Sequence, residues 1–363
     1  MKLKIHTDLS LLEFGAPVDL LIPFIGINNE EYKEGRLYAH TFDEYCRYAS
    51  DYIELTSIHE CDIFLLPINY NQKWDNKSDR PDRVNDFLNS VENSSKKIFV
   101  FLGHDISAIS VNVSNSIVFS GAIDKSKQVQ GVYSYPHFFS DLLAYNNSSF
   151  APKIKSKLPV VGFCGYAPPL ELKLSKEKAI GFLKLVANYT GLIKFFPDRI
   201  SHSYRARAIL AVKQSNKVKP NLRIKNAFAF GPNGQLNTGN TQESDTEFRK
   251  NFINNILESD YTLCVRGIGN NSIRFFETLC CGRIPVFVNT DSVLPFDHII
   301  DWRKKCVWVE EKNIDNIGNA VNEFHKSISD DEYQRLQIEL RYIWEEYLSP
   351  LGFYKNLKLF LKD

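Results

Sequence analysis

Short, continuously apolar runs alternate with longer segments of helical spacing along most of the chain. Asp62 to Pro67 (D-I-F-L-L-P) and Ile98 to Leu102 (I-F-V-F-L) are such runs, and Phe42 to Ile53 has the spacing of an amphipathic helix. A strand that is apolar on both of its faces is typical of a parallel sheet covered by helices on either side. The alternation therefore predicts an α/β fold built on parallel sheets.

The length and one polar segment divide this pattern into two units. A chain of 363 residues is long enough for two domains. Residues 146–158 are polar, contain a proline and are typical of a linker. We expect two doubly wound Rossmann-like domains facing each other across a cleft, at 1–152 and 153–348. A last helix within 349–363 is expected to pack back on the first domain.

Charge, cysteines and apolar run lengths exclude several classes of protein. The 44 basic and 43 acidic residues leave a net charge of +1 and no long basic block, so no nucleic-acid partner is expected. The seven cysteines follow no metal-ligand spacing, and we interpret them as reduced thiols. No signal peptide or run of 18 apolar residues is found. We expect a cytoplasmic protein without a membrane span, and leave open a peripheral association with the inner face of the membrane.

The most regular unit of the pattern lies in the second half. The sequence predicts a strand at Tyr261 to Val265, a Gly/Asn-rich loop at 266–271 and a helix at Ser272 to Cys281. Gly282 is expected to end the helix in a left-handed conformation. A second strand is expected at Ile284 to Val288. This strand–loop–helix–strand unit places a flexible loop before the N-terminus of a helix.

That loop has the chemistry of a phosphate site. Gly267 and Gly269 are expected to adopt positive φ and to let the backbone approach a ligand. Unpaired N–H groups at a helix N-terminus favour an anion, and the fork of Arg266 matches a diphosphate. Ser272 can either cap the helix or donate to phosphate. Glu277 repels phosphate, so we expect it to accept hydrogen bonds from ribose hydroxyls.

Two alternatives stay open at this point. Arg274 and Glu277 are three residues apart and could form a surface ion pair. Residues 267–272 also resemble the dinucleotide fingerprint G-x-G-x-x-G, which would suit an NAD(P)-dependent oxidoreductase. Two features count against that fingerprint: Ser272 stands where close helix–strand packing favours Gly or Ala, and Arg266 precedes the loop, where Rossmann turns are usually uncharged.

A wider block resembles the exostosin-type glycosyltransferases. It comprises R-G-x-G-x-x-S-x-R-x-x-E at 266–277, G-R-I-P-V at 282–286, D-S-V-L-P-F at 291–296 and I-D-W at 300–302. Weaker matches are D-I-F-L-L-P at 62–67 and the segment 99–105. The chain departs from the family pattern at Val265, Thr278 and Arg283, and lacks a Trp-Gly pair after residue 105. The resemblance implies the GT-B fold, with the donor on the C-terminal domain and the acceptor against the N-terminal one.

The resemblance also implies a reaction. We expect an inverting transfer of a sugar from a nucleotide diphosphate donor, a UDP-sugar, to a glycan or glycolipid acceptor in bacterial surface polysaccharide or lipopolysaccharide synthesis. No cofactor or metal is expected. A non-catalytic carbohydrate-binding relative is a further alternative.

Inversion needs a general base on the N-terminal domain. The candidate bases are Asp105 and then His104, with Asp8 and Glu13 as further candidates. Arg205 or Arg207 is expected to add a phosphate ligand. The donor-site residues that we expect are Arg266, Gly267, Gly269, Asn271, Ser272, Arg274, Glu277, Arg207 and Asp291.

Overall fold

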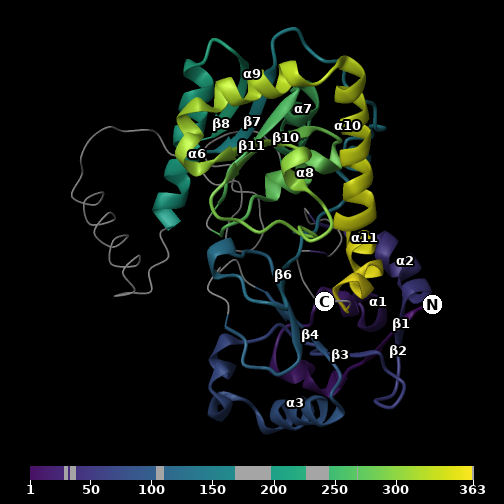
Figure 1. Ribbon diagram of the computed structural model, residues 1–363. Helices are drawn as coiled ribbons and strands as arrows, with labels where there is room; N and C mark the ends of the chain where they lie inside the picture. Colours follow the sequence, from purple (N-terminus) through teal and green to yellow (C-terminus); the bar gives the residue numbers. More distant parts are fainter. Residues whose placement is uncertain are drawn as a thin grey trace.

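The structure is a computed structural model with two lobes, each built on a parallel sheet (Figure 1). It describes residues 1–27, 32, 38–103, 110–167, 198–225, 245–267 and 269–361. Strands of the first 134 residues form the N-terminal lobe, and strands between residues 160 and 310 form the C-terminal lobe. The expected α/β fold of two Rossmann-like units is confirmed.

The N-terminal sheet has six parallel strands in the order β2-β1-β3-β4-β5-β6. Its apolar runs alternate between two cores: Ile63 and Leu65 join one, while Phe64 and Leu66 join the other. This alternation is why a strand of this kind is apolar at every position. The strands are β1 (Leu3–His6), β2 (Ile53–Leu55), β3 (Ile63–Leu65), β4 (Ile98–Leu102), β5 (Ser116–Ser120) and β6 (Val132–Ser134).

Short helices and 3-10 turns connect these strands. The helix expected from the amphipathic spacing at 42–53 is present as α2. The helices are α1 (Ile22–Ile25), α2 (Asp43–Tyr52), α3 (Asp82–Ser94) and α4 (Leu142–Tyr145), and the turns are η1 (Leu9–Phe14), η2 (Asp19–Leu21), η4 (Gln72–Asp75), η5 (Lys77–Asp79) and η6 (Lys125–Lys127).

The C-terminal sheet has five parallel strands in the order β11-β10-β9-β7-β8. The strands are β7 (Val160–Tyr166), β8 (Lys219–Lys225), β9 (Tyr261–Cys264), β10 (Ile284–Asn289) and β11 (Val307–Glu310). The helices are α6 (Asp198–Gln214), α7 (Asp245–Glu258), α8 (Ile273–Cys280), α9 (Ile317–Ser327) and α10 (Asp330–Ile343), with short turns at η7 (Trp302–Lys304) and η8 (Glu311–Asn316). A capping box between Ser329 and Glu332 begins α10.

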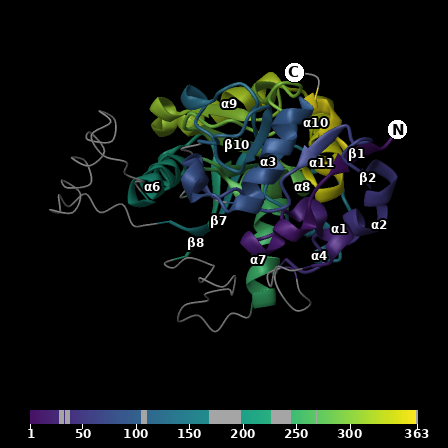
Figure 2. The same ribbon diagram turned by 90° about the horizontal axis from the view of Figure 1, so that it is seen from below.

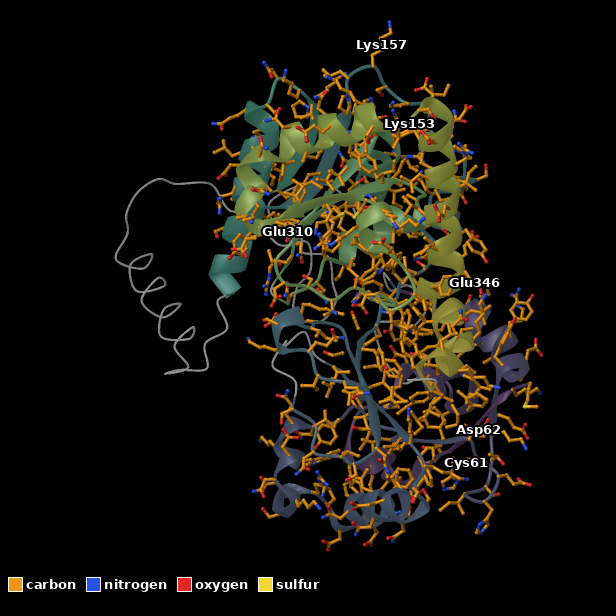
Figure 3. All side chains as sticks on the ribbon, viewed as in Figure 1. Cys61, Asp62, Lys153, Lys157, Glu310 and Glu346 are labelled. Carbon is orange, nitrogen blue, oxygen red and sulfur yellow. The ribbon has the colours of Figure 1, made fainter. Side chains whose placement is uncertain are left out.

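The segment after α10 passes from one lobe to the other. Figures 1 and 2 show α10 beside the C-terminal lobe and α11 (Pro350–Lys355) next to α2. Glu346, labelled in Figure 3, marks the crossing, within the π-helical turn η9 (Trp344–Leu348). Beyond α11, Phe360 of η10 (Leu357–Leu361) packs edge-on against Phe119 of β5, with ring centroids 5.0 Å apart.

Several expectations lie outside the described residues or were incomplete. The helix expected at 175–189 and the strand expected at 228–230 belong to ranges that the structure does not describe. Strands β2, β6 and β8 were not predicted. The domain limits at 152 and 348 stay predictions. Within the described ranges, none of the helices is long and apolar enough to cross a membrane.

Candidate functional site

The candidate site lies where the C-terminal sheet reverses its strand order. From β7 the sheet continues to β8 on one side, while β9 and β10 extend it on the other. In a parallel sheet, the carboxyl ends of the strands at such a switch point form the usual ligand-binding position. The carboxyl ends of β7 and β9 therefore bring together Tyr166 and the β9–α8 loop, residues 265–272.

The β9–α8 loop leads into α8 much as expected. Gly267 N donates to Asn271 O at 3.2 Å, and the helix begins at Ile273. Ser272 is the N-cap residue of α8, but its side chain makes no capping hydrogen bond, so the hydroxyl does not cap the helix. Gly282 has φ of 58° after the last turn, as predicted.

The expected positive φ at Gly267 is wrong. Gly267 lies outside the left-handed region, and a β-carbon on it would first meet Arg205 Nη2 at 3.7 Å. Its lack of a side chain therefore leaves room for a guanidinium. A closer approach occurs at Gly165 of β7, where φ is 144° and a β-carbon would lie 2.8 Å from Arg274 Nη2. Both glycines line arginine side chains.

Arg205 of α6 reaches into the switch point. It donates from Nη1 to Tyr166 O at 3.0 Å and from Nη2 to Arg266 O at 3.3 Å. Its Nε is buried and has no hydrogen-bond partner among the described residues. Burial, and then the charge of Arg274, lowers the pKa of Arg205 to about 9. The positive charge is thus held at a cost in free energy.

Arg274 of α8 is the second cation of the site, and it is half-buried. Its Nη2 donates to Cys164 O at 2.6 Å, and its guanidinium lies 4.3 Å from the ring centroid of Phe163. Its Nε is also buried without a hydrogen-bond partner among the described residues. Neither Arg274 nor Arg205 forms an ion pair within the described part of the chain. Two adjacent half-buried cations without a carboxylate favour the binding of an anion.

Arg266 stands at the start of the same loop. Burial lowers its pKa, and the nearby charges of Asp124, Tyr204 and Glu311 partly oppose that shift. Asp124 follows β5 and belongs to the N-terminal lobe. The charge of an N-terminal-lobe carboxylate therefore acts on Arg266.

Glu277 lies one turn beyond Arg274 on α8. Its Oε1 accepts a hydrogen bond from Arg249 Nη1 of α7 at 3.1 Å, and the two side chains are 10% and 6% exposed. The alternative of a surface pair between Arg274 and Glu277 is therefore wrong. The expected role of Glu277 toward a ribose stays a prediction.

Asn271 and Asp291 contact the N-terminal lobe. Asn271 Nδ2 donates to Gly121 O at 2.8 Å. Asp291, in the left-handed region with φ of 66°, accepts hydrogen bonds from the backbone N and the hydroxyl of Ser126, at 3.2 and 2.5 Å. Both residues were expected to bind the donor, and the structure places them where the two lobes meet. Their role toward a donor stays a prediction.

Asn270 was missed by the sequence analysis, although it is 1% exposed and central to this contact. Its Oδ1 accepts from Thr290 Oγ1 at 2.8 Å and Ser292 Oγ at 2.7 Å. Its Nδ2 donates to Thr290 O at 2.9 Å and to Asp124 Oδ1 at 2.7 Å. Two adjacent asparagines in a glycine loop were the available signal, but only Asn271 was chosen.

Arg207 lies apart from the half-buried arginines. It pairs with Asp315 at 2.8 Å, and both side chains are exposed. Of the two arginines expected on this helix, Arg205 is the one that contacts the β9–α8 loop. The expected role of Arg207 toward a phosphate stays a prediction.

Of the four candidate bases, the structure describes Asp8 and Glu13. His104 and Asp105 lie outside the described residues, as does Ile268 beside Gly269. Asp8 caps η1 through Ser10, whose hydroxyl hydrogen bond is the main cause of its lowered pKa. Glu13 pairs with Arg83. Asp8 and Arg83 line a cavity of about 450 Å³ beside α3.

A larger cavity lies elsewhere. It has a volume of about 1040 Å³, lies between α2, α4 and the end of α10, and is lined by none of the expected donor residues. The chemistry of the half-buried arginines, rather than cavity size, therefore locates the candidate site. Among the described residues, no group of three or more His, Cys, Asp or Glu is placed to hold a metal ion.

Comparison with known families covers this part of the chain. The family model of the "Exostosin GT47 domain" matches residues 204–324, which include most of α6, the β9–α8 loop and α8. Residues 204–324 are thus similar to a glycosyltransferase domain, and this similarity favours a transferase over the oxidoreductase alternative.

Curated exostosins resemble the chain over a similar length. Exostosin-1 of Drosophila melanogaster is 28% identical over 118 residues, and Exostosin-1a of Danio rerio is 32% identical over 103 residues. These matches cover 32% and 28% of this chain, but only 15% and 14% of the two relatives.

A solved structure, "Anabaena Alr3699/HepE in complex with UDP-glucose", aligns over 99% of both chains. The sequence identity is 11% and the TM-score 0.32. That likeness is too low to support an argument about this chain.

Proposed function

We propose that the protein is an inverting glycosyltransferase that transfers a sugar from a UDP-sugar to a glycan or glycolipid acceptor. The observation that carries this proposal is the pair of half-buried arginines, Arg205 and Arg274, at the switch point of the C-terminal sheet. A diphosphate supplies the negative charge that the described residues do not provide there. The exostosin match over the same elements supports a sugar nucleotide as its carrier.

In this proposal the arginines stabilise the leaving group. The acceptor hydroxyl attacks the anomeric carbon, the bond from that carbon to the diphosphate oxygen breaks, and UDP departs with the electron pair. Fixed positive charge and the N–H groups at the start of α8 stabilise the developing charge. We propose that the reaction needs no metal ion, because Arg205, Arg274 and Arg266 supply that positive charge.

The proton of the acceptor goes to a base on the N-terminal lobe. We propose Asp105 for this role, with His104 as the alternative. Both follow β4, whose carboxyl end lies at the same edge of the sheet as that of β5. The proposed setting is the cytoplasmic synthesis of a bacterial surface polysaccharide or lipopolysaccharide, at the inner face of the membrane.

Glu277 is proposed to bind the ribose. Its ion pair with Arg249 fixes one carboxylate oxygen and leaves further acceptor capacity on the carboxylate. Glu277→Gln is expected to weaken binding of UDP more than binding of 2′-deoxy-UDP, because only UDP has the 2′-hydroxyl. Equal weakening of both nucleotides would remove Glu277 from this role.

The decisive experiment is a donor screen with the purified protein. A panel of nucleotide sugars is incubated with acceptor glycans, and release of nucleoside diphosphate is measured with and without EDTA. We expect release from a UDP-sugar that EDTA does not prevent. Thermal shift with UDP and with NAD is the companion measurement. Stabilisation by NAD alone would overturn the proposal, and binding of a nucleotide sugar without turnover would favour a non-catalytic carbohydrate-binding protein.

A further inference from the structure

One of the contacts between the two lobes is made by an acidic side chain of the N-terminal lobe, Asp124. Asp124 follows β5 and pairs in a short antiparallel bridge with Ser292 of the C-terminal lobe. Its Oδ1 accepts a hydrogen bond from Asn270 Nδ2 at 2.7 Å, and its side chain is 16% exposed. Asp124 is thus an N-terminal-lobe carboxylate in direct contact with the β9–α8 loop.

Two hydrogen bonds within the C-terminal lobe fix the orientation of the Asn270 side chain. The hydroxyls of Thr290 and Ser292 both donate to Asn270 Oδ1, so the amide nitrogen must face the other way. That nitrogen donates to Thr290 O and to Asp124. The carboxylate of Asp124 is therefore held in a set position before any ligand binds.

The charged groups of the site are arranged in order from the C-terminal lobe toward the N-terminal lobe. Arg274 and Arg205 lie close enough to repel each other, and Arg205 donates to the backbone oxygen of Arg266. Asp124 contacts the same β9–α8 loop through Asn270, and its charge opposes the lowering of the pKa of Arg266. The order therefore runs from two half-buried cations, through a third cation, to an anion on the opposite lobe.

This arrangement of charges separates the positions that suit the two parts of a donor, the diphosphate and the sugar. A diphosphate belongs beside the arginines, and a carboxylate repels it. Asp124 therefore suits a neutral, hydroxyl-rich group attached beyond the phosphates. An ionised carboxylate accepts up to about four hydrogen bonds, and Asn270 and the exposed Lys127 are two of the partners of Asp124.

We propose that Asp124 binds the hydroxyl groups of the sugar carried by the donor, so that the N-terminal lobe selects the sugar while the C-terminal lobe binds the nucleotide. This inference rests on the proposed function. It makes recognition of the sugar depend on the contact between the lobes, since Asp124 is oriented by Asn270 across that contact.

The test compares a nucleotide with and without its sugar. Affinities of UDP and of the UDP-sugar accepted by the wild type in the donor screen are measured by calorimetry for the wild type and for Asp124→Asn. We expect the affinity for UDP to change less than twofold and that for the UDP-sugar to fall at least tenfold. The matched control is Asp297→Asn, which removes a carboxylate that pairs with Lys125 in the same contact and is expected to change neither affinity.

Other outcomes are equally informative. Unchanged affinity for both ligands, or equal weakening of both, would overturn the assignment and leave Asp124 as a structural tie between the lobes. Asp124→Glu keeps the charge but moves the carboxylate, so we expect it to change the ratio of turnover between UDP-glucose and UDP-galactose. An unchanged ratio would count against the assignment. Failure of the wild type to bind UDP would instead overturn the proposed function.

Discussion

The position of Arg205 on the buried face of α6 follows from the spacing of the apolar residues on that helix. Arg205 precedes Ala208, Ile209 and Val212 by three, four and seven residues, and all three are buried. An arginine on the apolar face of a helix needs either a partner inside the protein or a bound anion. Arg207, two residues on, faces away from Arg205. The periodicity of the buried residues therefore distinguishes Arg205 from Arg207, although the sequence analysis named both.

Arg205→Met is the test at this scale. The change removes the charge and keeps the length of the side chain, so affinity for UDP is expected to fall about 10- to 100-fold, in line with roughly 1.5–3 kcal/mol for hydrogen bonds to a charged group. Arg207→Met is the matched control and should alter affinity less than twofold, because Arg207 pairs with Asp315 on the surface. Calorimetric titration with UDP measures both. Equal losses in the two variants would exclude Arg205 from the phosphate site.

Other site residues were less accessible to sequence reasoning. The pairing of Glu277 with Arg249 joins α8 to α7, and no local spacing predicts it. The contacts of Asn271 and Asp291 with the N-terminal lobe depend on how the two lobes meet. Such contacts are set by tertiary packing, which the spacing of residues along the chain does not encode.

Among the elements, the edges of the sheets were the hardest to predict. The strands predicted from continuous apolar runs, such as β4, lie inside a sheet and are covered on both faces. The missed strands β2, β6 and β8 are all edge strands. Strand β8 (K-P-N-L-R-I-K) carries three charged residues and a proline, which is how an edge avoids pairing with another chain. An edge strand therefore lacks the apolar run that identifies a central one.

The end of α8 provides a test of element placement. In Gly282→Ala, the new β-carbon would lie 2.2 Å from Phe150 Cε2 in addition to occupying φ of 58°. Gly26→Ala is the matched control, because Gly26 also has positive φ but nothing within 4 Å of its β-carbon position. We expect about 1–3 kcal/mol of destabilisation for Gly26→Ala, whose φ of 85° and ψ of 173° disfavour any side chain, and clearly more for Gly282→Ala. Urea unfolding measures both, and equal effects would show that Phe150 moves aside freely.

The ion pair between Asp141, at the start of α4, and Arg341 of α10 predicts that the stability of the protein depends on pH. Burial alone would raise the pKa of Asp141, but hydrogen bonds and charge from Arg341, at 2.6 Å, outweigh burial and lower it. A lowered pKa means that the ionised form stabilises the fold above about pH 4, and this contribution is lost as the pH falls further.

Asp141→Asn tests that dependence. The variant should unfold at a lower temperature than the wild type at pH 7, and the difference should shrink below about pH 4. Asp301→Asn, which breaks an exposed pair with Lys304, is the control and should have no measurable effect. A temperature difference for Asp141→Asn that stays constant down to pH 3 would contradict the assignment.

At the scale of the whole molecule, aromatic side chains hold the lobes together. Phe296 of the C-terminal lobe contacts both Phe353 and Phe360, at 5.7 and 5.1 Å between ring centroids. The same two rings pack against Phe119 of the N-terminal sheet. The two-lobed architecture could be predicted from the alternating pattern, but this shared cluster depends on residues far apart in sequence.

Phe360→Ala is therefore expected to destabilise the protein by about 3–5 kcal/mol, the usual effect of removing a buried phenylalanine. The control is Ile338→Ala on the exposed face of α10, with an expected change below about 0.5 kcal/mol. Denaturant unfolding followed by tryptophan fluorescence measures both. A Phe360→Ala variant as stable as the control would show that the cluster is dispensable.

The cluster around Phe119 also has a consequence for biosynthesis. The N-terminal sheet emerges from the ribosome first, yet the rings that cover Phe119 are translated much later, at positions 353 and 360. At about 5–20 residues per second, the delay is on the order of 10–50 s. During that interval the nascent sheet exposes an apolar face to solvent, where chaperones that bind unfinished chains can reach it.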